Sequence, residues 1–300
     1  MTMSVDEHVT MDDGVRLWVS TAGSGPPVVL CHGGPGMADY LEPVSEALAD
    51  LATVHRWDQR GAGRSGPDGP FSIERSVADL EGVRTHLGHH SWVLIGHSWG
   101  ANLAILYAQR HPQRVAGIVY VCGTGLEWWP VYTRVHKENQ RARLDGAMGQ
   151  RLRELHGKER NGQEQHEYEW LYLLTGFADR DRAPELASLV HDHDRRYPVN
   201  QEANRAINAE LRSLAIHEQR EACRRIAAQV LVVDCLGDPR PPAANDSLVA
   251  ALPVARRVAL DDCGHFPWLE DPDAFQALVR PFVAELLVGP LHESRSPTRK

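Results

Sequence analysis

Residues 92–110 read WVLIGHSWGANLAILYAQR. Four apolar residues come first, the pattern GxSxG surrounds Ser98, and the remainder has the composition of a buried helix. A nucleophilic serine needs this strand, sharp turn and helix, because small residues two positions away on either side let the chain turn tightly. The pattern predicts that Ser98 is a nucleophile beside a helix N-terminus, which favours developing negative charge. A glycine-rich turn with an incidental serine is the alternative.

Six further apolar runs end at turn residues in the same way. They span residues 15–21, 27–31, 52–57, 115–122, 230–236 and 255–260. Apolar residues recur at helical spacing in residues 40–51, 73–87, 101–110 and 275–288. Continuous runs of Val, Ile and Leu are typical of strands buried on both faces, and their alternation with helices predicts an α/β fold with a mostly parallel sheet.

Residues 126–225 interrupt this alternation. The segment shows no convincing strand and is rich in Glu, Arg, Gln and His, with Trp and Leu at helical intervals. It predicts a helical cap over the sheet, inserted between a first core part at residues 1–125 and a second at residues 226–288. The polar composition of residues 289–300 predicts a disordered tail.

A histidine late in the chain is the expected general base. His265 follows the strand predicted at residues 255–260, and Asp238 comes just after the preceding strand. In a parallel sheet both side chains lie at the same edge as Ser98. Asp238 would hold the imidazole in its reactive tautomer. Asp234 is the competing carboxylate, but it lies inside the predicted strand, where burying a charge is costly.

The strand at residues 27–31 runs into the sequence HGGPG at residues 32–36. An oxyanion hole needs two N–H donors, one from the residue after the nucleophile and one from a loop at the end of a neighbouring strand. The candidates are Trp99 and Gly34, with Gly33 as the adjacent possibility. An ordinary glycine-rich turn is the alternative interpretation of this loop.

Five motifs carry a family resemblance: HGGPG, DQRGAGRSG (residues 58–66), GHSWG, the GDP loop around Asp238, and DDCGHFPWLEDP (residues 261–272). Together they resemble the α/β-hydrolase superfamily, and specifically its proline iminopeptidase branch. The resemblance covers the two core parts well and the cap loosely. It implies an eight-stranded, mostly parallel sheet flanked by helices, with the cap inserted after the sixth strand and a catalytic triad of Ser98, Asp238 and His265.

Members of this branch bind the free N-terminal amine of the substrate through glutamates in the cap. Residues 197–204 resemble the region that holds one such glutamate, which makes Glu202 the first candidate in this chain. Glu169 and Glu210 are weaker candidates. For each of them, a solvated charge on a helix face is the alternative.

The predicted chemistry is acyl transfer, with Ser98 attacking a carbonyl and His265 moving the proton. By the resemblance, the substrate is a short peptide with N-terminal proline or another small amide. A carboxylesterase or lactonase acting on small acyl substrates is one alternative, and a non-catalytic ligand-binding protein on the same fold is another. No cofactor is expected.

The 300 residues carry a formal net charge of −8. This balance argues against nucleic-acid and anionic-membrane partners, because both need clustered Lys and Arg. No stretch approaches the roughly 20 apolar residues that cross a bilayer. The N-terminus has no secretory signal, and the five cysteines contain no CxxC pair. We therefore expect a cytoplasmic protein with reduced cysteines; the sequence carries no indication of its oligomeric state.

Three further patterns have less specific interpretations. GAGRSG at residues 61–66 matches GxGxxG but lacks a following helix, so it is interpreted as a loop that packs Asp58 and Arg60 behind the site. HDHD at residues 191–194 is similar to a run of metal ligands, but no third cluster pairs with it, and no metal site is predicted. Three tryptophans either line an apolar pocket or form the core of the cap: Trp128, Trp129 and Trp170.

Overall fold

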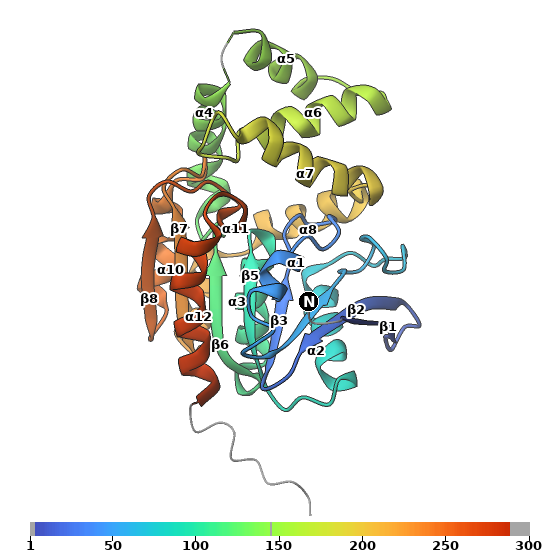
Figure 1. Cartoon of the computed structure of the whole chain (residues 1–300), viewed down its shortest axis with the longest axis vertical. Coiled ribbons are helices and arrows are strands. Elements are labelled where there is room, and N and C mark those ends of the chain that lie inside the picture. Colours follow the sequence, from blue (N-terminus) through green and yellow to red (C-terminus); the bar gives the residue numbers. More distant parts are fainter. Residues whose placement is uncertain (1–3, 145, 289–300) are drawn as a thin grey trace, which may run out of the picture.

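One mixed sheet forms the centre of the molecule (Figure 1). The computed structural model describes residues 4–144 and 146–288. The strands are β1 (Val5–Thr10), β2 (Arg16–Gly23), β3 (Pro27–Cys31), β4 (Thr53–Trp57), β5 (Trp92–His97), β6 (Val115–Val121), β7 (Gln229–Cys235) and β8 (Ala255–Leu260). Their order is β1-β2-β4-β3-β5-β6-β7-β8; β2 is antiparallel to β1 and β4, and all later pairs are parallel. The predicted eight-stranded, mostly parallel sheet is confirmed.

β1 is the strand that hydropathy did not indicate. It pairs with β2 from Val5 opposite Thr21 to Thr10 opposite Arg16. Of its residues, Val9 alone is buried. An edge strand of this kind leaves most of its side chains in water, so it needs no apolar run. The other seven strands occupy the seven predicted apolar runs to within two residues at each end.

Alternate strand residues point into two separate cores. In β3, Val28 and Leu30 belong to one core, and Val29 and Cys31 to the other. The helices that cover the two faces are α1 (Glu42–Glu46) and α12 (Pro272–Val288) on the first, and α2 (Ile73–His86), α3 (Trp99–Arg110) and α10 (Asp246–Ala251) on the second. Burial on both faces explains why these strands read as continuous apolar runs.

Residues 40–51 differ from the predicted helix. α1 is helical only from Glu42 to Glu46, and the chain then turns towards β4, which begins at Thr53. The apolar spacing beyond Glu46 comes from turn residues such as Leu48, which is buried in the first core. The chain must reverse within these few residues to enter β4, and a longer helix would not reach it.

Helices fill the described part of the chain between β6 and β7. They are η2 (Trp128–Tyr132), α4 (Thr133–Arg143), α5 (Gly146–His156), α6 (Gly162–Leu174), α7 (Ala183–Arg196), α8 (Gln201–Ser213) and α9 (Ile216–Cys223). Figure 1 shows α4 to α7 standing above the sheet. α9 instead packs against α3 and α10, and Ile207 of α8 belongs to the second core. The layer over the sheet is thus shorter than residues 126–225, and the tail predicted at residues 289–300 lies outside the described residues.

The GxGxxG segment is a loop, and no helix begins after it until Ile73. Asp58 is buried and accepts hydrogen bonds from the Arg64 backbone N–H at 2.8 Å and from Arg64 Nε at 2.6 Å. Arg60 is also buried and pairs with Asp79. All five cysteines of the chain are buried and unpaired. Among the described helices, none has both the length and the hydrophobicity that a membrane crossing needs.

Candidate active site

Ser98 occupies the tight turn between β5 and α3. Its backbone has φ 56° and ψ −119°, in the positive-φ region that residues other than glycine rarely adopt. A Cβ atom on Gly100 would lie 1.9 Å from the Cys31 carbonyl oxygen, and one on Gly96 would lie 2.2 Å from the Gly100 carbonyl oxygen. The glycines of GxSxG are therefore required by the close approach of α3 to β3 and β5. This strain is stored where the chain presents a hydroxyl to a cavity.

Asp238 and His265 meet beyond the ends of β7 and β8. Asp238 Oδ2 lies 2.6 Å from His265 Nδ1, and both side chains are buried. A carboxylate only accepts hydrogen bonds, so Nδ1 carries the imidazole proton and Nε2 keeps a free lone pair. The second carboxylate oxygen, Oδ1, accepts from the Arg240 backbone N–H at 2.8 Å and from its guanidinium at 3.3 Å.

The Asp238 carboxyl is held in its charged form. Burial by itself would raise its pKa, but the charges of His265 and Arg240 outweigh burial and hold the pKa well below its usual range. Asp234, the competing carboxylate, lies on β7 and pairs with Arg257 and with Asn245 Nδ2 at 2.7 Å. The carboxylate of Asp234 is therefore occupied by Asn245 and Arg257 and makes no hydrogen bond to His265.

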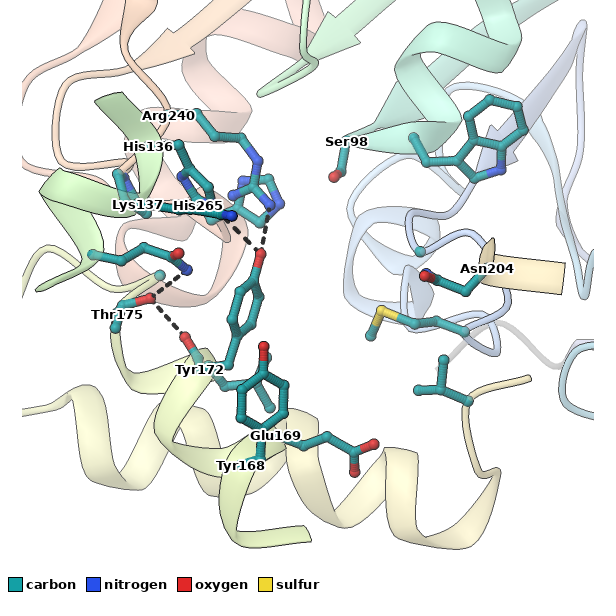
Figure 2. A pocket seen from close by; sticks show the side chains of 18 of the residues that line it. Ser98, His136, Lys137, Tyr168, Glu169, Tyr172, Thr175, Asn204, Arg240 and His265 are labelled. Carbon is teal, nitrogen blue, oxygen red and sulfur yellow. Dashed lines mark hydrogen bonds between the residues drawn. The ribbon is translucent and has the colours of Figure 1, made fainter. Parts of the chain in front are cut away.

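Ser98 and His265 line the same cavity, with the Ser98 hydroxyl on the side that faces the imidazole (Figure 2). Within residues 4–144 and 146–288, no hydrogen bond joins the two side chains. Hydrogen bonds between a nucleophile and its base are often long in unliganded enzymes and tighten when substrate binds. Ser98 and His265 thus face one cavity at one edge of the sheet.

Two residues that line the cavity together with Ser98 have backbone N–H groups without a hydrogen-bond partner in the described part of the chain. These residues are Trp99, the first residue of α3, and Gly34. Gly34 has φ 124°, a conformation that favours glycine. The Gly33 N–H is instead bonded to Tyr40 Oη at 2.7 Å, and Gly33 does not line the cavity. Of the two candidates in this loop, Gly34 is the one whose N–H has no partner in the described part of the chain, whereas the Gly33 N–H is already engaged.

His97 connects the glycine loop to the base, and sequence reasoning missed it. His97 Nε2 donates to the His265 carbonyl oxygen at 2.7 Å, so its Nδ1 is unprotonated and accepts from Tyr40 Oη at 2.6 Å. Tyr40 in turn accepts from the Gly33 N–H. Burial keeps the pKa of His97 well below its ordinary value, so the ring stays neutral. The only sequence signal was its place inside GxSxG, where the pattern allows any residue.

Tyr40→Phe removes the hydroxyl that satisfies both Gly33 and His97. We expect the free energy of unfolding to fall by about 1–3 kcal/mol, because a buried N–H and a buried ring nitrogen lose their partner. Urea unfolding followed by circular dichroism measures this change. Tyr107→Phe is the matched control, since Tyr107 Oη bonds Glu81 and neither residue lines the cavity: it should lower stability and leave kcat/KM unchanged. An unchanged midpoint for Tyr40→Phe would contradict the network.

Burial, together with the positive charge of Arg240, lowers the pKa of His265 below its ordinary value of 6.5. The imidazole must be neutral to accept a proton, so kcat/KM should stay high as the pH falls to about 6.5 and decline only below it. Arg240→Gln removes a charge that disfavours the imidazolium, and the acid limb should therefore move to higher pH. A pH profile of kcat/KM on an uncharged ester tests this. An acid limb that stays in place or moves down would contradict the assignment.

A cavity of about 660 Å³ lies between the sheet edge and the helices above it, and Ser98 and His265 form part of its wall. This volume is typical of sites for small molecules. Its apolar and aromatic lining includes Met37, Tyr40, Trp128, Trp129, Leu144, Leu152, Tyr168, Tyr172 and Phe266. Of the three tryptophans singled out in the sequence, Trp170 differs: it packs in the first core and donates from Nε1 to Ser188 Oγ at 3.2 Å.

Of the three glutamates that the sequence singled out, Glu169 alone lines the cavity, and Asp194, which the sequence did not single out, joins it there. Glu202, the first substrate-binding candidate, is exposed on the first turn of α8 and does not line the cavity. Glu210, on α8, accepts a hydrogen bond at 2.7 Å from the N–H of Ile73, the first residue of α2. Glu169 does line the cavity (Figure 2). Asp194 lines it too, with a side chain only 5% exposed.

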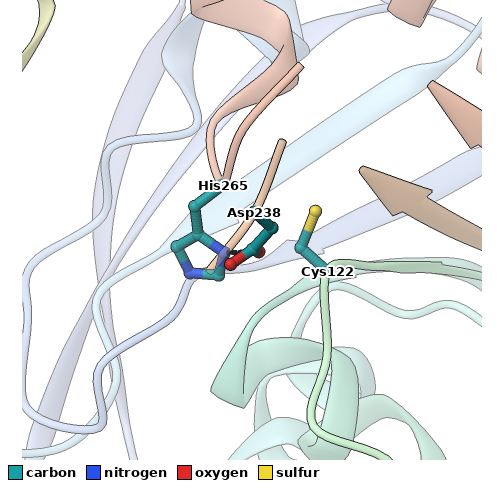
Figure 3. Close-up of side chains that lie close together, drawn as sticks. All are labelled: Cys122, Asp238 and His265. Atoms are coloured by element: carbon teal, nitrogen blue, oxygen red, sulfur yellow. Dashed lines mark hydrogen bonds and ion pairs between the residues drawn. The ribbon is translucent and has the colours of Figure 1, made fainter. Parts of the chain in front are cut away.

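Cys122 lies next to the Asp238–His265 pair (Figure 3). One donor atom from each of the three residues lies within 4.8 Å of the others. The neighbouring Cys235 side chain and burial raise the pKa of the Cys122 thiol well above its ordinary value. A protonated thiol is a poor metal ligand. We therefore interpret Cys122 as packing beside the pair and not as part of a metal centre.

Three comparisons relate this geometry to known proteins. The family model described as "alpha/beta hydrolase fold" matches residues 26–272. A proline iminopeptidase of Xylella fastidiosa is 37% identical over 141 residues, which are 41% of this chain and 43% of that protein. The chain thus spans less than half the length of the curated relatives that it matches.

Two solved structures share the fold over nearly the whole chain. A proline iminopeptidase of Mycobacterium smegmatis is 23% identical and covers 94% of this chain and 99% of its own, with a TM-score of 0.70. An esterase of Exiguobacterium antarcticum is 18% identical and covers 93% and 99%, with a TM-score of 0.74. At these identities the likeness concerns the fold alone.

Proposed function

Since the chain belongs to the alpha/beta hydrolase fold family, we propose that it is a serine hydrolase acting by acyl transfer. One observation carries the proposal: a strained serine, two free N–H groups and a buried Asp–His pair converge on one cavity. These are the parts that nucleophilic acyl substitution needs, in a chain order of Ser98, Asp238 and His265.

The steps follow from the hydrogen bonds. His265 Nε2 takes the proton of Ser98 as Oγ attacks the substrate carbonyl carbon, and the Trp99 and Gly34 N–H groups stabilise the negative oxygen that forms. His265 then gives the proton to the leaving group, which departs and leaves an acyl-enzyme. A water attacks the ester, again through His265, and frees Ser98. Asp238 stays ionised throughout and stabilises the imidazolium.

We propose an aminopeptidase that releases N-terminal proline, or a similar residue, from short peptides or amides. The partial identity to proline iminopeptidases supports this substrate class. The charges of the cavity support it too. Glu169 and Asp194 offer carboxylates to a free amine, and five cations offer partners to the carboxylate at the other end of a short peptide: Lys137, Arg141, Arg153, Arg160 and Arg240.

The alternative is a carboxylesterase or lactonase. The aromatic and aliphatic lining around Trp128 and Trp129 favours it, because such a wall would hold an uncharged acyl chain without using either carboxylate. The same serine and base would serve both reactions, so the wall of the cavity and not the reacting groups distinguishes them.

A fluorophosphonate probe tests the enzyme class, and a substrate panel tests the substrate. Folded protein should be labelled covalently at Ser98, as located by peptide mass spectrometry. Unlabelled but folded protein would favour a non-catalytic binding protein. Prolyl arylamides with a free amine should turn over faster than the same compounds with a blocked amine. Turnover of short acyl esters alone would favour the esterase alternative.

Glu169→Gln and Asp194→Asn remove the negative charges offered to the amine. We expect each to raise KM for a free-amine prolyl arylamide by about tenfold to a hundredfold, since hydrogen bonds to charged groups contribute roughly 1.5–3 kcal/mol. KM for a neutral ester should stay unchanged. Glu202→Gln is the matched control, because Glu202 is exposed outside the cavity. If the variants changed KM for the amide and for the ester equally, neither carboxylate would bind the amine.

A further inference from the structure

Helices α6 and α7 pack against each other above the sheet (Figure 1), and each carries a histidine and an acid one turn apart. On α6 these are His166 and Glu169, and on α7 they are His191 and Asp194. Residues three apart lie on the same face of a helix, so each pair can offer both donors in one direction. The packing of these two helices brings the HDHD run next to a further His and Glu, a pairing that the sequence did not indicate.

Three of these side chains already form a cluster. One donor atom each from His166, Glu169 and His191 lies within 4.8 Å of the others. His166 Nδ1 is 3.7 Å from Glu169 Oε2, and the two imidazole rings are 5.7 Å apart. Around a tetrahedral ion with bonds of 2.0–2.1 Å, ligand atoms lie about 3.3 Å apart. Small side-chain rotations would close this gap, and the exposed His166 is free to make them.

Two polar atoms next to the cluster lack partners. In the described part of the chain, His191 Nε2 is buried without a hydrogen bond, and so is Asp194 Oδ1. Buried polar atoms without partners are rare because each costs free energy. A cation held between these side chains would satisfy the nitrogen and offset the repulsion of the two carboxylates.

We propose that α6 and α7 bind one divalent transition-metal ion through His166, Glu169 and His191, with Asp194 beside it. Two imidazoles and a carboxylate suit zinc, cobalt or nickel, whereas magnesium and calcium prefer oxygen ligands throughout. The site does not include Ser98, but it shares Glu169 and Asp194 with the cavity wall that the proposed function assigns to the substrate amine. Its consequence would be to join the two helices, and it would engage the carboxylate of Glu169 in the wall of the cavity.

Metal binding is measured directly on the full chain, prepared without a histidine tag. Titration calorimetry with zinc chloride should give one ion per chain. His166→Ala and His191→Ala should each weaken binding at least about tenfold, whereas His217→Ala, an exposed histidine on α9, should leave it unchanged. Zinc should also raise the midpoint of thermal unfolding in the wild type and in His217→Ala but not in the two other variants.

Cobalt provides a second readout that does not depend on activity. Bound to the wild type, it should give visible absorption bands that disappear in His166→Ala. That variant changes an exposed side chain, so it is expected to fold even if His191→Ala does not. No saturable binding, or equal binding by wild type and a His166→Ala/His191→Ala double variant, would overturn the proposal.

Discussion

Ser98→Ala should lower kcat/KM by about 10⁴-fold or more for every substrate that the protein hydrolyses, because no other side chain replaces the attacking oxygen. The loss should be the same for amides and esters. The fold should remain intact, since Ser98 Oγ donates to and accepts from no group in the described structure, and alanine keeps the Cβ atom that the turn already accommodates. Steady-state kinetics and fluorophosphonate labelling measure the effect.

Ser247→Ala is the matched control for this variant. Its hydroxyl likewise has no hydrogen-bond partner in the described structure, but it is buried on α10, outside the cavity. Activity should remain at the wild-type level. If Ser98→Ala kept more than a small fraction of the activity while folded, hydrolysis would run through another group and the acyl-transfer mechanism would be wrong.

Asp238→Asn should lower kcat by about 10⁴-fold, with a smaller effect on KM. The amide would present an N–H or a neutral oxygen to His265 Nδ1, so the proton would no longer be fixed there and the imidazolium would lose its counter-charge. The pKa of His265, which Asp238 raises, should fall further. Kinetics on an uncharged ester measure the effect on chemistry without a contribution from amine binding.

Asp234→Asn separates this role from general loss of a buried carboxylate. Asp234 is as buried as Asp238, but its partners are Asn245 and Arg257. We expect a loss of stability of about 1–3 kcal/mol and little change in kcat. If Asp234→Asn lost most of its kcat and Asp238→Asn remained active, Asp234 and not Asp238 would be the carboxylate that orients His265.

The sequence predicted those parts of the candidate site that depend on sterics and strand ends within a few residues of each position. Gly96 and Gly100 have to be glycines because a Cβ atom would strike backbone oxygens. Asp238 and His265 follow their strands directly, and parallel strands bring such positions to one edge. The same logic located seven strands but not β1, since an exposed edge strand carries no apolar signal.

The wall of the cavity could not be read in this way. Whether a carboxylate on an amphipathic helix faces water or a cavity depends on how the helix is rotated and where it packs. Glu202 and Asp194 have similar local sequences of polar residues, yet the first is exposed and the second is buried in the wall. The hydrogen bonds of His97 join residues 40, 97 and 265, and no local pattern connects positions so far apart.

The sequence by itself determined the α/β sheet, the turn that presents Ser98 and the order of the three candidate catalytic residues. These follow from hydropathy and from steric limits that act within a few residues of each position. Only the tertiary structure decided which amides are free to meet an oxyanion, which carboxylates face the cavity and which histidines gather between α6 and α7. Those outcomes depend on how separate helices pack, and packing is a property of the whole chain.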